Sequence, residues 1–237
     1  MDGSEKTRCC YLCISLLTAV SLIFSLPKGV SSQVGGEVTF DAFLSWSSSF
    51  SRSTIDRMRE DGRVGGFFDT RILSTNRSYN YKLTATWLTP EVIRASARLS
   101  QFQNFLSDDE TKHLVSEAEE AGDTVVLVEI DPREGSGVIP LDWVAMLRPK
   151  GPTADPQGLR ARGVSMPQLR RLPALSGRLP RDYAYDRFWV VFPLTNEQGR
   201  PLFSASTREA ELVVRIYEKE GRVTWNVPPS IIARASQ

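Results

Sequence analysis

The stretch between Thr89 and Gly122 carries the clearest secondary-structure signals in the chain, and it limits what the rest can fold into. Thr89 can cap a helix because a proline follows it at the first helical position, and apolar residues then recur with helical spacing. Ser107 with Glu110 three residues later is a capping box that starts a second helix, and Gly122 can end it. These signals predict a helical hairpin over residues 90–121.

The sequence on both sides of this hairpin is typical of β-structure. Before it, SYNYKLTATWL alternates aromatic or apolar residues with polar ones, which predicts a strand in a hairpin that turns near residues 75–78. After it, five short runs are rich in β-branched or aromatic residues: Val125–Ile130, Val138–Leu147, Phe188–Leu194, Leu212–Tyr217 and Arg222–Val227. Short strands separated by turns favour antiparallel pairing. We therefore expect an α+β fold that is predominantly antiparallel β, sandwich-like, with an inserted helical hairpin.

Four tryptophans lie in or at the end of these predicted strands: Trp87, Trp143, Trp189 and Trp225. A row of exposed tryptophans would suggest sugar stacking, but core packing is the usual use of this residue in a sandwich. Both faces of the run Phe188–Leu194 are apolar. We therefore expect Trp189 to lie in a central strand that is covered on both sides.

Residues 1–32 have the layout of a secretory signal peptide. Eighteen uncharged residues, Cys9–Leu26, follow Lys6 and Arg8, and small residues before Gln33 suit a signal peptidase. All three cysteines lie in this run, so we interpret them as small hydrophobes rather than as redox or zinc ligands. We expect export to the periplasm or the extracellular space. The alternative is an uncleaved membrane anchor, because eighteen residues is close to the ~20 that a spanning helix requires.

Charge and length limit the remaining chain. The full sequence has 29 basic and 28 acidic residues; three basic and two acidic ones lie in residues 1–32, so 26 of each remain after cleavage. A neutral chain is not a general polyanion binder, so we expect no nucleic-acid partner, and membrane contact only through the N-terminal segment. We expect residues 33–62 to form a flexible entry, with a strand near Glu37–Phe43 and a short helix near Thr54–Asp61. Residues 63–237 can form a single sandwich-like domain.

The segment 149–182 is rich in proline and arginine. Its prolines exclude a regular helix or a central strand, and its length exceeds that of an ordinary loop. We interpret it as an excursion from the domain. Its arginines could contact phosphate or carboxylate groups of an anionic envelope component or of a protein partner: Arg160, Arg162, Arg170, Arg171, Arg178 and Arg181. In the competing interpretation it is a solvated linker whose leucines pack against the domain.

Few residues suggest catalysis or metal binding. His113 is the single histidine, with acidic residues one turn away, and it could act as a general base. A solvent-exposed, non-catalytic histidine is the competing interpretation. Glu129, Asp131 and Glu134 could supply calcium ligands, but they lack the alternating pattern of a calcium loop, and a plain turn competes with this reading. No glycine-rich turn between a strand and a helix suggests a nucleotide cofactor. We expect no cofactor.

Together these features predict an exported, non-catalytic envelope or interaction module whose partner the sequence does not identify. One alternative is a cofactor-independent hydrolase that uses carboxylates or His113. The other is the same module tethered by an N-terminal membrane anchor.

Overall fold

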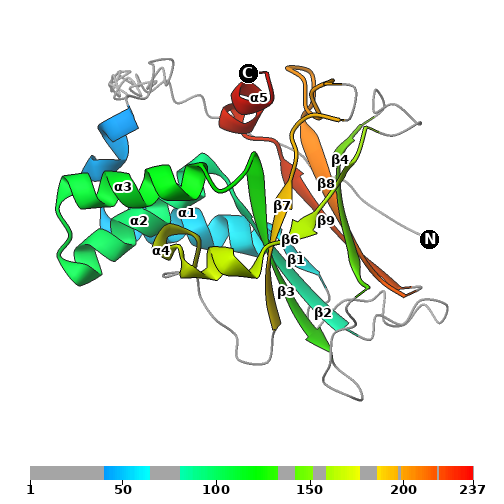
Figure 1. Cartoon of the computed structure of the whole chain (residues 1–237), viewed down its shortest axis with the longest axis horizontal. Helices are drawn as coiled ribbons and strands as arrows, with labels where there is room; N and C mark the ends of the chain where they lie inside the picture. The colour runs from blue at the N-terminus through cyan, green and yellow to red at the C-terminus, as the bar shows by residue number, and fades with distance from the viewer. Residues whose placement is uncertain are drawn as a thin grey trace, which may run out of the picture. The chain divides into compact units, whose positions relative to one another are not determined.

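The computed structural model describes residues 40–64, 81–132, 142–151, 159–176, 186–196, 199–217 and 219–236 (Figure 1). All of them belong to one compact unit, Val38–Gln237. Several sequence predictions fall on other residues and lie outside the described part: the segment 1–32 with its cysteines, the turn at 75–78, Glu134, Arg178 and Arg181.

The elements of this unit mix short helices with strands in the order shown by Figure 1. From the N-terminal side they are η1 (Phe40–Ser45), α1 (Ser48–Asp61), β1 (Arg63–Val64), β2 (Tyr81–Leu88), α2 (Pro90–Asn104), α3 (Asp108–Glu119), β3 (Thr124–Pro132), β4 (Val144–Lys150), β5 (Ala161–Arg162), β6 (Val164–Ser165), η3 (Pro167–Arg171), α4 (Pro173–Ser176), β7 (Asp186–Phe192), β8 (Glu209–Ile216), β9 (Lys219–Asn226) and α5 (Pro229–Ala235).

The strands form two antiparallel sheets. Within the described residues, one has five strands in the order β1-β2-β3-β7-β6, and the other has four in the order β5-β4-β8-β9. The expected α+β fold, mainly antiparallel and with an inserted helical hairpin, is therefore confirmed. One hydrophobic cluster contains inward-facing residues of both sheets. Within it, the rings of Trp87 on β2 and Trp225 on β9 lie 5.5 Å apart between centroids. The sandwich-like arrangement stays a prediction, and this shared cluster supports it.

Helices cover the opposite face of the five-stranded sheet. Figure 1 shows α1 to α4 on one side of this sheet and β4, β8 and β9 on the other. A second hydrophobic cluster fills the helical side and includes Ile55, Val92, Leu127 and Trp189. On β7 the neighbouring Val190 belongs to the first cluster instead. The prediction that Trp189 lies in a strand covered on both faces is therefore confirmed.

Local capping explains why α2 and α3 form where the sequence predicts them. The Thr89 hydroxyl accepts a hydrogen bond from the backbone N–H of Val92 at the start of α2. At the start of α3, Ser107 and Glu110 make the complete capping box. Phe105 ends α2 in the left-handed conformation, with φ of 54°. The hairpin thus follows from side-chain to backbone hydrogen bonds that are local in sequence.

Several predicted boundaries were wrong. Phe40–Ser45 form a 3₁₀ helix where we predicted the end of a strand, and the helix before Gly62 starts at Ser48, six residues earlier than expected. Strand β4 runs over Val144–Lys150, so it extends past the predicted end at Leu147 and includes Pro149. Helix α5 was not predicted from the sequence. The start of α1 is capped by Ser47, whose side chain accepts a hydrogen bond from the Phe50 backbone N–H.

The described part of the proline-rich segment, residues 159–176, packs against the two sheets, although we predicted an excursion from the domain. β5 pairs with β4 of the four-stranded sheet, and β6 pairs with β7 of the five-stranded sheet. Gly163 stands between them, where a Cβ atom would lie 2.3 Å from Val190 Cγ1. Two prolines in this segment take the first positions of η3 and α4, where proline is favoured. Leu169 and Leu175 are buried, as the linker interpretation expected.

Candidate binding face

The outer face of the four-stranded sheet carries an unusual mixture of arginine and apolar side chains. Along β8, Ala210, Leu212 and Val214 are buried in the core between the sheets. The alternate positions, such as Val213 and Arg215, therefore point away from that core, because successive side chains in a strand face opposite sides. The same alternation on β4 and β9 forms one continuous outer face.

A hollow of about 190 Å³ lies on this face. Its apolar lining comes from Val144, Met146 and Val213, all adjacent through the strand register. Its charged lining consists of Arg148, Arg160, Arg215, Arg222 and Glu220. We call these eight residues the arginine hollow.

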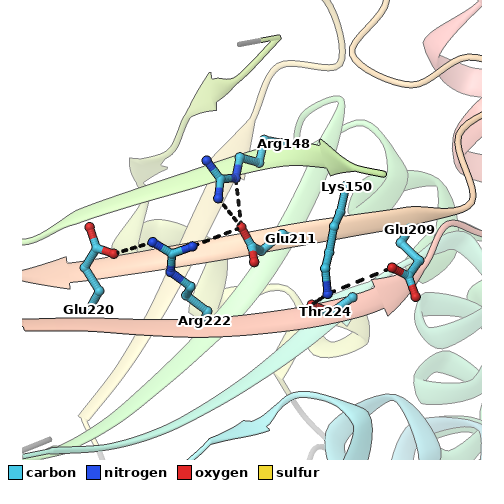
Figure 2. Close-up of polar contacts among 7 residues, drawn as sticks. All are labelled: Arg148, Lys150, Glu209, Glu211, Glu220, Arg222 and Thr224. Atoms are coloured by element: carbon cyan, nitrogen blue, oxygen red, sulfur yellow. Dashed lines mark hydrogen bonds and ion pairs between the residues drawn. The ribbon is translucent and has the colours of Figure 1, made fainter. Parts of the chain in front are cut away.

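Two carboxylates hold some of these arginines in place (Figure 2). Arg148 donates through Nε to Glu211 Oε2 at 2.8 Å and also through Nη2. Arg222 lies with Nη1 3.8 Å from the same Glu211 oxygen and with Nη2 2.8 Å from Glu220 Oε2. The side chain of Glu211 is only 10% exposed, whereas that of Glu220 is 32% exposed. Glu211 is therefore a partly buried anchor for two guanidinium groups.

Beside this network, Lys150 balances the charge of Glu209. Its Nζ donates to the Thr224 hydroxyl at 3.0 Å and lies 3.9 Å from Glu209 Oε2 (Figure 2). Both charged side chains are nearly half exposed. Neither residue lines the arginine hollow.

Arg160 and Arg215 differ from the other two arginines of the hollow. Within the described part of the chain, neither makes an ion pair or a side-chain hydrogen bond, and both are exposed. Arg215 pairs in register with Val144 on one side and Glu220 on the other. Four arginines therefore face two glutamates, and two positive charges remain in excess around an apolar floor.

Of the six arginines predicted from the sequence, the four that the structure describes lie in two separate places. Arg160 lines the hollow, and Arg162 lies opposite Met146 in the neighbouring edge strand. Arg170 and Arg171 lie in η3, which packs with α4 beside the five-stranded sheet. Arg178 and Arg181 lie outside the described residues. The prediction that all six form one anionic contact surface stays untested.

Sequence reasoning missed the other arginines of the hollow. Arg148, Arg215 and Arg222 come from three different strands, and pairing of β4 with β8 and of β8 with β9 brings them together. The alternation within β8 was a usable signal for the outward direction of Arg215, because Val213 and Arg215 alternate with the core-facing residues of that strand. The order of the strands, which decides the neighbours, is not encoded in such a local pattern.

His113 lies on the exposed side of α3. Its side chain is 71% exposed, and Nδ1 is 3.5 Å from Glu117 Oε2 on the next turn. An open depression beside it is lined by Leu106, Asp109, Glu110 and Leu114 in addition to the histidine. Among the described residues that line this depression there is no serine, threonine or cysteine. The hydrolase alternative therefore loses the support that a buried histidine would have given it.

The acidic residue next to this depression has a structural role. The Glu110 carboxylate accepts hydrogen bonds from the Ser107 backbone N–H at 2.7 Å and from the Ser107 hydroxyl at 2.8 Å. The backbone hydrogen bond, with the hydroxyl second, holds the pKa of Glu110 below its ordinary value. Two residues further along α3, a hydrogen bond from the Lys112 ammonium group to Asp41 raises the pKa of Lys112.

Of the three residues considered as calcium ligands, Glu129 has a different use. It is fully buried on the helical side of β3, where Arg59 and Arg187 both form ion pairs with it. Asp131 is its near neighbour on β3, and Glu134 lies outside the described residues. Among the described side chains, no group of three or more histidine, cysteine or acidic residues is placed to bind a metal ion.

None of the helices in the described residues has both the length and the hydrophobicity needed to cross a membrane. No protein family matches the chain, and no curated protein matches it. One solved structure is similar: a crystal structure of a novel protein of unknown function from Burkholderia pseudomallei, with a TM-score of 0.37 and 10% sequence identity over 78% of this chain and 88% of that one.

Proposed function

We propose that this protein is an exported, non-catalytic interaction module that binds an acidic segment of a partner protein at the arginine hollow. The observation that carries the proposal is the pair Arg160 and Arg215. These two exposed arginines have no acidic partner in the described part of the chain, and they stand beside two further arginines. Guanidinium groups bind carboxylates with a planar, two-pronged geometry.

The charge arrangement has no evident value for stability. Like charges that stand close together on a sheet are destabilising, and exposed ion pairs add little to folding. An arginine cluster that is only half neutralised therefore costs stability in the free protein. An acidic ligand would remove this repulsion, which supports binding as the use of the cluster.

The size and floor of the hollow support a peptide rather than a drug-sized molecule. Pockets for such small molecules measure roughly 300–1,000 Å³, and this hollow measures about 190 Å³. Val144, Met146 and Val213 offer an apolar floor between the charges. A peptide that carries one apolar side chain between two carboxylates would match both the apolar floor and the arginines around it.

Export is part of the proposal, supported by the signal-like residues 1–32 of the sequence. The partner can then be another protein of the envelope or of the extracellular space.

Binding of a labelled peptide of alternating Glu and Leu to the full chain tests the proposal. Fluorescence anisotropy at low salt is expected to show saturable binding that weakens as salt is added. The double variant Arg160→Ser/Arg215→Ser removes two exposed charged contacts worth about 0.2–1 kcal/mol each, so the affinity should fall by about two- to thirtyfold.

The matched control is Arg170→Ser/Arg171→Ser, which removes two exposed arginines outside the hollow and should bind like the wild type. A peptide of alternating Gln and Leu, free phosphate and anionic vesicles complete the comparison. Absence of peptide binding, or equal loss in both double variants, would contradict the proposal. Tighter binding of phosphate or of vesicles than of the Glu-Leu peptide would show that the hollow binds an anion other than an acidic segment.

A further inference from the structure

Glu220 occupies a distinctive place at the arginine hollow. It lies near the start of β9, directly opposite Arg215 in the strand register. Its carboxylate oxygen Oε2 is 2.8 Å from Arg222 Nη2 (Figure 2), and among the described residues it is the one acidic side chain that lines the hollow. A carboxylate of the chain itself therefore already stands among the arginines proposed to receive a carboxylate of the partner.

The second carboxylate of the network is held differently. Glu211 is more deeply buried and is shared by Arg148 and Arg222. Its removal would take one carboxylate away from each of these two guanidinium groups. Glu220 has one ion pair, with Arg222, and its side chain is about three times as exposed as that of Glu211. Exposed pairs of this kind are weak and readily exchange partners with solvent or with another charge.

We infer that Glu220 is an internal competitor for the carboxylate of the ligand. This inference rests on the proposed function. In the free protein, Glu220 neutralises Arg222. When an acidic segment binds, its carboxylate takes the place beside Arg215 and Arg222, and the Glu220 side chain turns to solvent. The residue thus lowers affinity and makes binding selective for ligands that bring more than one carboxylate.

Substitution of Glu220 tests the inference in the same anisotropy titration of the full chain. Glu220→Gln should tighten binding of the Glu-Leu peptide by about two- to fivefold, the range that corresponds to an exposed ion pair. Glu220→Asp keeps the charge but shortens the side chain by one methylene. It should also tighten binding, though by less, because it reaches Arg222 poorly.

The matched control is Glu209→Gln. It removes the same charge from the same face of the sheet, but Glu209 pairs with Lys150 and does not line the hollow. It should change the affinity less than Glu220→Gln does. Equal tightening in Glu209→Gln and Glu220→Gln, with none in Glu220→Asp, would show that net charge alone governs binding and would overturn the inference.

Unchanged affinity in Glu220→Gln would overturn it as well, while peptide binding by the wild type would still support the proposed function. Failure of the wild type and of every variant to bind would reject the proposed function itself.

Discussion

Glu129 on β3 and Arg187 on β7 form a buried ion pair across adjacent strands, with 3.3 Å between Glu129 Oε1 and Arg187 Nε. Arg59 of α1 approaches the same carboxylate, with Nε 3.4 Å from Oε2. The carboxylate is fully buried, and the two guanidinium groups are about 15% exposed or less. This cluster therefore joins helix α1 to two strands of the five-stranded sheet.

Loss of the shared carboxylate should destabilise the fold. Glu129→Gln removes a carboxylate that two largely buried arginines share, and breaking a buried pair in this way costs about 3–5 kcal/mol. Urea unfolding followed by circular dichroism measures the effect. The control Glu60→Gln removes the carboxylate of an exposed pair with Arg63 and should cost less than about 1 kcal/mol. Equal stability of the two variants would contradict this role for Glu129.

Gly163 should not tolerate a side chain. The added Cβ of Gly163→Ala would lie 2.3 Å from Val190 Cγ1 and 2.7 Å from Phe192 Cε1, both on β7. Overpacking of this kind costs about 1–3 kcal/mol, and thermal unfolding can measure it. Val190→Ala removes the nearest obstructing atom, so the double variant should be less destabilised than the two single variants together. Strict additivity would show that the space around Gly163 is not limiting.

The capping box of α3 should make stability depend on pH. The pKa of Glu110 is lowered in the folded chain by hydrogen bonds from Ser107. Its contribution to stability is therefore fully present above the ordinary glutamate pKa of 4.5 and is lost as pH falls through the lower folded value. Denaturant unfolding at several pH values should show this loss in the wild type and a smaller one in Glu110→Gln.

The partner residue of this box gives an independent check. Ser107→Ala removes the hydroxyl that caps the Glu110 N–H, which should cost about 1 kcal/mol at neutral pH. The pKa of Glu110, measured by NMR titration, should rise only in part, because the stronger backbone hydrogen bond remains. A pKa that is already ordinary in the wild type would contradict the role of the capping box.

Phe105 should be replaceable with a gain in stability. It adopts φ of 54° at the end of α2, and its residue surface is 94% exposed. Left-handed conformations cost an ordinary side chain roughly 1–2 kcal/mol, and asparagine adopts them more readily. Phe105→Asn should therefore raise the free energy of unfolding by about 0.5–1 kcal/mol. A lower melting temperature would indicate that the ring makes a stabilising contact.

Sequence reasoning succeeded where the structure is determined locally. Thr89 and Ser107 cap their helices through residues three positions away, so the signal for α2 and α3 lies within one turn of chain. It failed where distant segments decide the outcome. The ion pair between Arg148 and Glu211 joins residues 63 positions apart, and sequence patterns do not specify which strands pair. Arg160 was predicted to contact an anion, but its neighbours in the hollow could be found only from the sheet.

Amide chemical-shift mapping of the ¹⁵N-labelled full chain during titration with the Glu-Leu peptide tests the central proposal most directly. We predict that the shifts concentrate on the outward-facing residues of β4, β8 and β9, with Val144, Met146 and Val213 among them, and that signals of η3 stay in place. Shifts centred on Arg170 and Arg171, or no saturable shifts at low salt, would contradict binding at the arginine hollow.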